Sequence, residues 1–209
     1  MSETGTEDGR RYGGMSAAER SEERRLRLLD AGLELFGTRG YAATTIEQLC
    51  AQARLNPRYF YAEVDSREAL LRAVYDRHVE EVREAVLAAI AAAPPDPRGR
   101  MSLALRAFID GSLADERAAR VNYFEMVGVS PDLEQRRREV LGSYADLVAS
   151  QIAAMEPPIL PPGADLRMSA VALVSATDGL IIDALGGPGE PDRDAMIATL
   201  TELFTPGAP

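Results

Sequence analysis

Apolar residues recur at helical spacing along most of this chain, and clusters of proline and glycine interrupt them. Between residues 46 and 53 the positions i, i+3, i+4 and i+7 are occupied by Ile46, Leu49, Cys50 and Ala53. The interruptions are PPDPRG at 94–99, GVSP at 128–131, PPILPPG at 157–163 and GGPGEP at 186–191. No segment alternates apolar and polar residues convincingly, as a half-buried strand would. The pattern predicts an all-α fold.

The 209 residues are long enough for one large domain or two small ones. Asn56 and Ser66 are expected to cap helices, and Pro57 suits a first helical turn. The first 18 residues are polar and are expected to be disordered. We therefore predict a tail over 1–18, an N-terminal three-helix helix-turn-helix domain over 19–65, and a larger helical bundle over 66–205. The expected helices run over about 17–37, 45–53, a short segment from 57, 66–93, 100–114, 116–127, 131–155, 164–185 and 192–204.

Composition argues against several classes of protein. Cys50 is the one cysteine, so no intramolecular disulfide can form. Asp178 and Asp183 interrupt the most apolar stretch, and no apolar run reaches the roughly 18 residues of a membrane span. The first 18 residues lack the apolar core of a secretory signal. We therefore expect a cytoplasmic protein that does not enter a membrane.

Catalytic and metal-binding motifs are not evident. No zinc-ligand spacing and no phosphate-binding glycine loop occurs, and the one histidine, His78, has no evident nucleophile partner. We expect no bound metal, no cofactor and no enzymatic activity. His78 shares a helical stripe with Tyr75 and Val82, which favours a packed interface histidine over a pH switch.

Charge is distributed unevenly along the chain. The formal net charge is -10, yet arginines outnumber acidic residues between Arg10 and Tyr61, and acidic residues outnumber arginines from Ser66 onward. A basic end on an acidic body is suited to face a polyanion. A chance fluctuation in composition explains the asymmetry equally well, so charge alone does not identify a partner.

The stretch LNPRYFYAEVDSREAL at 55–70 gives the more specific signal. A nine-residue helix, a short turn and a second short helix form a helix-turn-helix. Phe60 and Val64 lie four residues apart and share the buried face, which leaves Arg58, Tyr59 and Tyr61 pointing away. Arginine bonds guanine edges and tyrosine hydroxyls reach phosphates, as a recognition helix in a major groove requires. The alternative is a surface tyrosine pair that packs against another subunit.

The segment LLDAGLELFGTRGYAATTIEQLCAQARLNPRYFYAEVDSREALLRAV resembles the DNA-binding domain of the TetR family of bacterial regulators. The matching signals are the small and apolar first two helices, the GY..TT exit, the F-Y pair and the S-R-E-A-L start of the fourth helix. The sequence departs from the family pattern at Arg54, where glycine is usual, at Pro57, where a basic residue is usual, and at Glu63-Val64, where His-Phe is common. Base preference is therefore not transferable.

The resemblance implies a mechanism as well as a fold. It implies a homodimer on double-stranded DNA, and most simply a repressor released from an inverted-repeat operator by a small apolar molecule in the body. That ligand would move the fourth helix of each subunit and so change the distance between the two recognition helices of the dimer. The DNA contacts implied are phosphate contacts from Tyr41, Thr45, Tyr61 and Arg67, and base reading by Asn56, Pro57, Arg58 and Tyr59.

The body is therefore expected to be a ligand-binding and dimerisation bundle. Apolar stripes on the last two long helices suit a four-helix dimer interface, and its candidate residues are Leu173, Ile181, Met196, Leu200 and Leu203. The alternative for these stripes is an intramolecular core.

The middle of the body is rich in aromatic residues and methionine, as an apolar ligand pocket would be. The candidate pocket residues are Phe108, Tyr123, Phe124, Val127, Tyr144 and Thr177. Ordinary core packing explains most of them as well. Asn122, Glu125 and Asp178 are candidate polar anchors.

Two other functions remain open. One is a helical protein-interaction module whose helix-turn-helix is not used on DNA. The other is an all-helical enzyme with buried carboxylates, which would require Asp178 and Glu125 to pair beside a cavity.

Overall fold

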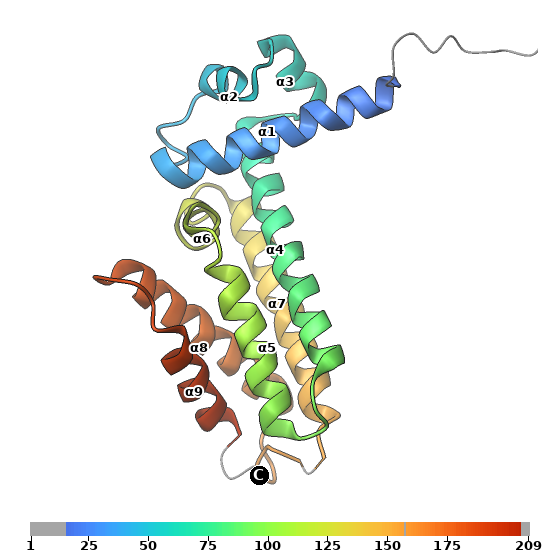
Figure 1. Ribbon diagram of the computed structural model, residues 1–209, viewed down its shortest axis with the longest axis vertical. Coiled ribbons are helices and arrows are strands. Elements are labelled where there is room, and N and C mark those ends of the chain that lie inside the picture. The colour runs from blue at the N-terminus through green and yellow to red at the C-terminus, as the bar shows by residue number, and fades with distance from the viewer. Residues whose placement is uncertain (1–15, 157, 206–209) are drawn as a thin grey trace, which may run out of the picture.

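The computed structural model describes residues 16–156 and 158–205, and every regular element in those residues is a helix. One long helix and two short ones lie at one end of a longer bundle (Figure 1). The predicted all-α fold is confirmed. The elements are α1 (Ala17–Arg39), α2 (Ile46–Ala53), α3 (Pro57–Glu63), α4 (Arg67–Ala92), α5 (Pro97–Ser112), α6 (Glu116–Arg120), η1 (Val121–Glu125), α7 (Pro131–Ala153), α8 (Leu166–Gly186) and α9 (Arg193–Phe204).

Side-chain caps set the helix starts. Asn56 and Ser66 accept hydrogen bonds from the first turns of α3 and α4, as predicted. Ser16 and Glu19 form a capping box, in which the Glu19 N–H donates to the Ser16 Oγ at 3.1 Å. The cap starts α1 at Ala17, so the predicted tail over 1–18 was too long at its C-terminal end. The rest of that predicted tail lies outside the described residues.

The expected helix over 116–127 is two elements of different geometry. Helix α6 ends at Arg120, and η1 continues as one π-helical turn in which the Met126 N–H donates to the Val121 carbonyl at 3.2 Å. A π turn holds an extra residue, so it rotates the side chains that follow it relative to an α-helix. Such turns occur frequently at functional sites.

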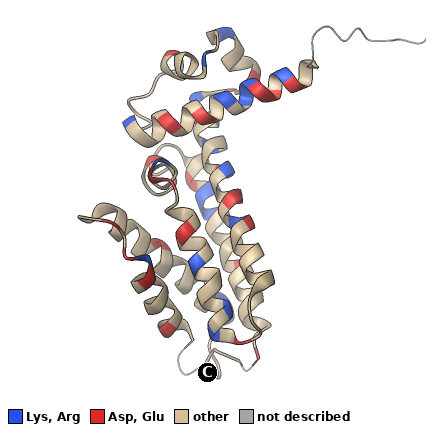
Figure 2. Cartoon of the chain, viewed as in Figure 1, with Lys and Arg blue, Asp and Glu red and all other residues tan. Residues whose placement is uncertain are grey.

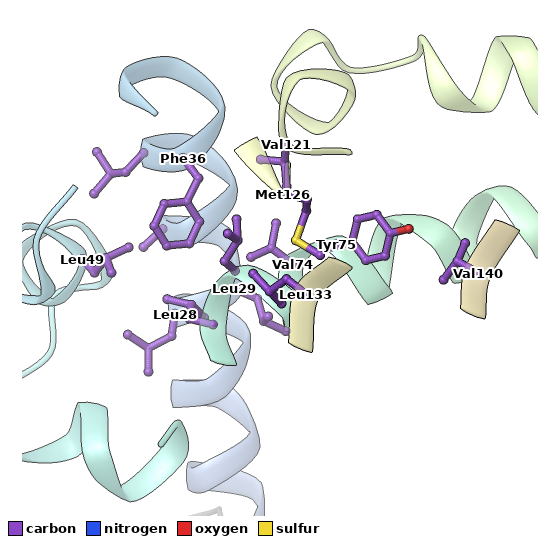
Figure 3. Close-up of a cluster of buried hydrophobic side chains, with 14 of the residues drawn as sticks. Leu28, Leu29, Phe36, Leu49, Val74, Tyr75, Val121, Met126, Leu133 and Val140 are labelled. Carbon is purple, nitrogen blue, oxygen red and sulfur yellow. The ribbon is translucent and has the colours of Figure 1, made fainter. Parts of the chain in front are cut away.

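One apolar core joins the N-terminal head, which we define as α1 to α3, to the upper part of the body (Figure 3). Phe36 from α1 and Leu49 from α2 are fully buried in it. Val74 from α4 and Met126, which follows η1, lie in the same cluster. A shift of η1 or of α4 is therefore expected to displace the helices of the head, because close-packed interiors transmit displacement.

A second core lies lower in the bundle, between α5, α7, α8 and α9. It corrects the predicted dimer interface, because four of the five candidates are buried within the single chain and do not reach its surface. These four are Leu173, Ile181, Met196 and Leu200. Only Leu203 is on the surface, with 65% of its area exposed. The intramolecular alternative holds for the other four.

Helix α8 nevertheless carries an apolar outer face. Met168, Val171 and Ile182 are exposed on it. Within the described residues α8 is the one helix that is long and apolar enough to span a membrane by length and composition, despite Asp178 and Asp183. Only 28% of its most apolar stretch is buried in the structure. Its inner face packs on α7 and α9, so the outer face is the part that lacks cover.

Candidate functional sites

The turn between α2 and α3 keeps its tight geometry without glycine. Arg54 adopts the left-handed conformation with φ 53° and ψ 46°, and it is the one non-glycine residue with positive φ among those described. For a residue with a side chain, the left-handed conformation costs roughly 1–2 kcal/mol relative to the right-handed one. The turn is closed by the Leu55 N–H, which donates to the Cys50 carbonyl at 2.9 Å. Cys50 itself is buried, as predicted.

Helix α3 presents one side to the core and the other to solvent. Phe60 is fully buried, whereas Val64 is only half-buried, so the predicted buried face is narrower than expected. Asn56, Pro57, Arg58 and Tyr61 are exposed, and Tyr59 is partly exposed. The candidate base-reading segment therefore lies together on the outer surface.

Arg58 and Tyr59 form one unit on this surface. The Arg58 Nη2 donates to the Tyr59 hydroxyl at 2.7 Å, and its guanidinium carbon lies 4.6 Å from the Tyr59 ring centroid. That hydrogen bond lowers the pKa of Tyr59, and the Arg58 charge acts in the same direction. Arg24 from α1 lies 5.0 Å from the same ring. The contacts hold Arg58 in one orientation, which favours a directed contact.

Glu63 does not belong to the exposed side of α3. Its carboxylate accepts hydrogen bonds from the Ser21 hydroxyl and from the Arg24 Nε at 2.6 Å, and only 4% of its side chain is exposed. The Ser21 hydrogen bond is the largest cause of its lowered pKa. The departure from the family pattern thus ties α3 to α1, and its charge is paired with Arg24 instead of opposing phosphate.

Two of the predicted phosphate contacts, Tyr41 and Arg67, meet at the start of α4, and Thr45 lies beside them in the chain. Arg67 donates to the Thr44 carbonyl, and its guanidinium carbon lies 4.2 Å from the Tyr41 ring centroid. Thr45 caps α2 through the Gln48 N–H. Arg67 therefore fixes the α1–α2 loop to α4. A second role toward phosphate is compatible with its partial exposure.

Basic and acidic residues alternate along α1 (Figure 2). Several arginines near the head are paired, including Arg24 with Glu63 and Arg77 with Asp30. The arginine surplus of this part of the sequence is therefore partly neutralised in the fold.

Two adjoining cavities occupy the middle of the body. The first, cavity 1, has an empty volume of about 640 Å³ including its mouth, and lies between α4, α5, α7 and α8. Three predicted pocket residues line it, namely Phe108, Tyr144 and Thr177. The Phe108 and Tyr144 rings meet edge to face with centroids 5.1 Å apart. The other lining side chains are almost all aliphatic, with Arg100 and Gln151 as exceptions.

The second, cavity 2, has an empty volume of about 560 Å³ and is more polar. It shares Phe108, Tyr144 and Val174 with cavity 1, so the two are adjacent. Its polar lining is Tyr75, Ser112, Asn122, Tyr123, Arg137 and Asp178. The predicted pocket residue Tyr123 is therefore found here.

Asp178 is the acidic residue of cavity 2. Burial raises its pKa to about 6, and the Arg137 charge and a hydrogen bond with Tyr123 oppose this rise. Burial likewise raises the pKa of Tyr123.

Two predicted pocket residues lie elsewhere. Phe124 is 41% exposed and Val127 is 50% exposed, and neither lines cavity 1 or cavity 2. They were assigned to the pocket because this stretch is rich in aromatic residues and methionine, and composition does not show which side chains point inward. Nothing in the sequence VNYFE signals the π turn either.

Glu125 also points away from the cavities. Its Oε2 accepts from the Tyr41 N–H at 2.7 Å, and its Oε1 accepts from the Arg120 Nε at 2.9 Å. The pair with Asp178 on which the enzyme hypothesis depended is therefore not formed. Glu125 instead joins the body to the α1–α2 loop of the head.

Helix α6 makes a second joint with the head. The Arg117 Nη1 donates to Glu34 on α1 at 2.7 Å. A Cβ on Gly37 would lie 2.4 Å from the Cβ of Arg117, so only glycine allows α1 and α6 to approach this closely.

His78 is packed as predicted. It is 8% exposed, burial lowers its pKa, and its Nε2 is buried without a hydrogen-bond partner.

Comparisons with known proteins agree with this geometry. The profile of bacterial regulatory proteins of the tetR family matches residues 28–74. The profile of the C-terminal domain of BetI-type transcriptional repressors matches residues 97–205, which is more than half of the chain.

The transcriptional activator FasR of Mycolicibacterium smegmatis is 32% identical over 132 residues. The match covers 63% of this chain and 60% of FasR, so less than two thirds of that relative is spanned.

Solved structures match over nearly the whole fold. FadR from Bacillus subtilis, in complex with stearoyl-CoA, superposes with a TM-score of 0.78 at 17% identity, covering 88% of this chain and 99% of FadR. AibR, in complex with isovaleryl coenzyme A and operator DNA, gives a TM-score of 0.67 at 16% identity, covering 88% of this chain and 98% of AibR. At these identities the likeness concerns the fold alone. With both family profiles matched in order along one all-helical chain, the protein belongs to the TetR family of bacterial transcriptional regulators.

Proposed function

We propose that this regulator is a repressor that a small, largely apolar molecule releases from an inverted-repeat operator. The observation that carries the proposal is η1, which joins the two candidate sites. Asn122 and Tyr123 of this element line cavity 2, while Glu125 at its end accepts a hydrogen bond from Tyr41 in the head. A ligand that displaces η1 changes the position of the head.

The regulator is expected to act in the cytoplasm as a homodimer. The exposed apolar residues of α8 and α9 support this: Met168, Val171, Ile182 and Leu203 form no part of the intramolecular core. Each chain supplies one reading helix, so two are needed to read an inverted repeat. Half-sites are expected to lie about one helical turn of DNA apart, roughly 34 Å, or a multiple of it.

The DNA contacts are expected to come from the exposed side of α3 and from the start of α4. Arg58 is suited to a bidentate contact with guanine, and Tyr61, 63% exposed, is suited to phosphate. Asn56 and Thr45 cap their helices through their side chains, so they position neighbouring backbone N–H groups as well.

Relatives support ligand control in general terms. FadR and AibR were solved with acyl-coenzyme A molecules, and AibR also with operator DNA. Their low identity does not carry the ligand over. The matched C-terminal profile describes repressors, whereas FasR is an activator. We favour a repressor because a ligand that displaces η1 disturbs the joint between body and head.

Selection of genomic fragments bound by the purified protein tests the proposal. We expect inverted repeats, binding as a dimer, and derepression of a reporter gene by compounds that bind the body. A monomer that binds single half-sites tightly would contradict it. Absence of any preferred DNA, with capture of a defined protein instead, would favour the protein-interaction module.

A further inference from the structure

The polar end of the paired cavities holds one acceptor without a donor, Asn122 Oδ1, and one buried carboxylate, Asp178, whose hydrogen-bond partner is Tyr123. Asp178 lies there on α8, and the amide Oδ1 of Asn122 on η1 is fully buried without a hydrogen-bond partner. Buried polar groups are nearly always hydrogen-bonded, so an unpaired one calls for an explanation. Both groups line the same cavity, and a ligand that carries hydrogen-bond donors would satisfy both.

The surroundings of Asp178 favour a positively charged donor. Tyr75, Tyr123 and Tyr144 line the same cavity, and aromatic faces attract cations. Arg137 is the one basic residue that lines cavity 2, and its Nη1 lies 3.3 Å from the Glu134 carboxylate. Its charge is thus shared with Glu134, which leaves the Asp178 carboxylate incompletely balanced in a partly buried site.

The apolar end gives room for a chain. Met101 lines cavity 1 and Ser112 lines cavity 2, and both residues lie on α5. At about 1.5 Å per residue they are separated by about 16 Å, which suits an extended alkyl chain of about twelve carbons. Arg100 is the one basic residue at the apolar end, and it donates to Gln151 at 3.4 Å. It is the alternative binding site for a ligand with an anionic head group.

We propose that the effector is a lipophilic amine, whose ammonium group donates to Asp178 and Asn122 and whose alkyl chain fills cavity 1. The assignment rests on the proposed function, because it names the ligand class for the same cavity. It also fits the mechanism, since Asn122 lies on η1 and a ligand bound to it contacts the element that reaches Tyr41.

Calorimetric titration of the full-length protein with dodecylamine and with dodecanoate, below their micelle concentrations at pH 7.5, tests the assignment. We expect the amine to bind wild type at least ten times more tightly than the carboxylate. Asp178→Asn keeps the shape and removes the charge, and it should weaken amine binding about tenfold or more. Asp183→Asn, an exposed carboxylate on the same helix, is the matched control and should leave binding unchanged.

Acidification gives a second readout that requires no variant. The pKa of Asp178 is about 6, so most of the carboxylate is charged at pH 7.5 and about one tenth at pH 5. The other ionisable groups that line the cavity are Arg137 on α7 and three tyrosines, Tyr75, Tyr123 and Tyr144. Burial raises the pKa of each tyrosine, so all three stay neutral in this range. Amine affinity should therefore fall about tenfold from pH 7.5 to pH 5.

Equal binding of the amine by the Asp178 and Asp183 variants overturns the proposal, as does dodecanoate binding as tightly as the amine. Asn122→Ala provides a second variant if Asp178→Asn misfolds, and it should weaken the amine several-fold. Selected operator DNA in parallel samples separates the two proposals. If another compound releases the protein from operator DNA and the amine does not bind, only the amine assignment is wrong. If the wild-type protein binds no DNA, the regulator proposal is wrong even if the amine binds.

Discussion

Replacement of Glu125 by alanine tests whether η1 transmits the state of the cavities to the head. The carboxylate accepts from the Tyr41 N–H at 2.7 Å and from the Arg120 Nε at 2.9 Å. A hydrogen bond to a charged group contributes about 1.5–3 kcal/mol. The pair with Arg120 contributes less than about 1 kcal/mol, because that guanidinium is largely exposed to solvent.

We expect Glu125→Ala to lower the free energy of unfolding by about 2 kcal/mol. Most of that loss arises at the joint between head and body, so the orientation of the head is less well fixed. About 1.4 kcal/mol changes an equilibrium tenfold, so operator affinity should fall about tenfold. Ligand affinity should rise in the same variant, because coupling between two binding sites is reciprocal.

Urea denaturation measures the loss of stability, fluorescence anisotropy with a labelled operator measures operator affinity, and calorimetry measures ligand affinity. Glu125→Gln keeps an acceptor for Tyr41 and should give a smaller loss. The exposed residue Glu116 supplies the control variant, Glu116→Ala. If Glu125→Ala is less stable yet binds operator and ligand like Glu116→Ala, the contact is structural and η1 does not carry the signal.

Arg58→Ala should relax the preference at one base position by about 1–3 kcal/mol, measured with single-base operator variants. Ala104→Phe places a ring in cavity 1 and should abolish ligand release while sparing operator affinity, whereas Val127→Trp, at an exposed position, should respond like the parent. Val171→Glu adds charge to the outer face of α8 and should give a monomer by light scattering. The pKa of Asp178 is raised on folding from 3.8 to about 6, so its charge destabilises the fold increasingly between these pH values and fully above about pH 6. Asp178→Asn should therefore raise the free energy of unfolding by roughly 1–3 kcal/mol at pH 7.5, with a gain that vanishes near pH 4, measured by denaturation at both pH values.

Local signals in the sequence predict most of the helices. Asn56, Pro57 and Ser66 mark helix starts because their side chains act within one turn, and those starts are confirmed. Phe60 is the buried anchor of α3, as its spacing suggests. These interactions depend only on residues close in the chain, which is why the sequence reveals them.

Predictions that depend on which element packs against which were less successful. The stripe of Leu173 and Ile181 shows that one face of α8 is buried, but periodicity does not distinguish a partner within the chain from one in a second copy. The π turn at η1 has no compositional signal, and the aromatic composition of its segment does not show that Phe124 and Val127 are exposed. Glu125 was missed as the joint with Tyr41 because the two residues are far apart in sequence.

The position of cavity 2 changes how a ligand is expected to act. Helix α4 has 26 residues and is roughly 39 Å long. A ligand at its far end would therefore act on the head over that whole length. Tyr75, however, lines cavity 2 and belongs to the same buried core as Phe36 and Leu49 of the head (Figure 3). It lies only eight residues after Arg67, a rise of about 12 Å. A ligand at Asp178 would therefore contact residues whose neighbours are in the head, and we expect displacement of Tyr75 or of η1 to move α1 relative to α4.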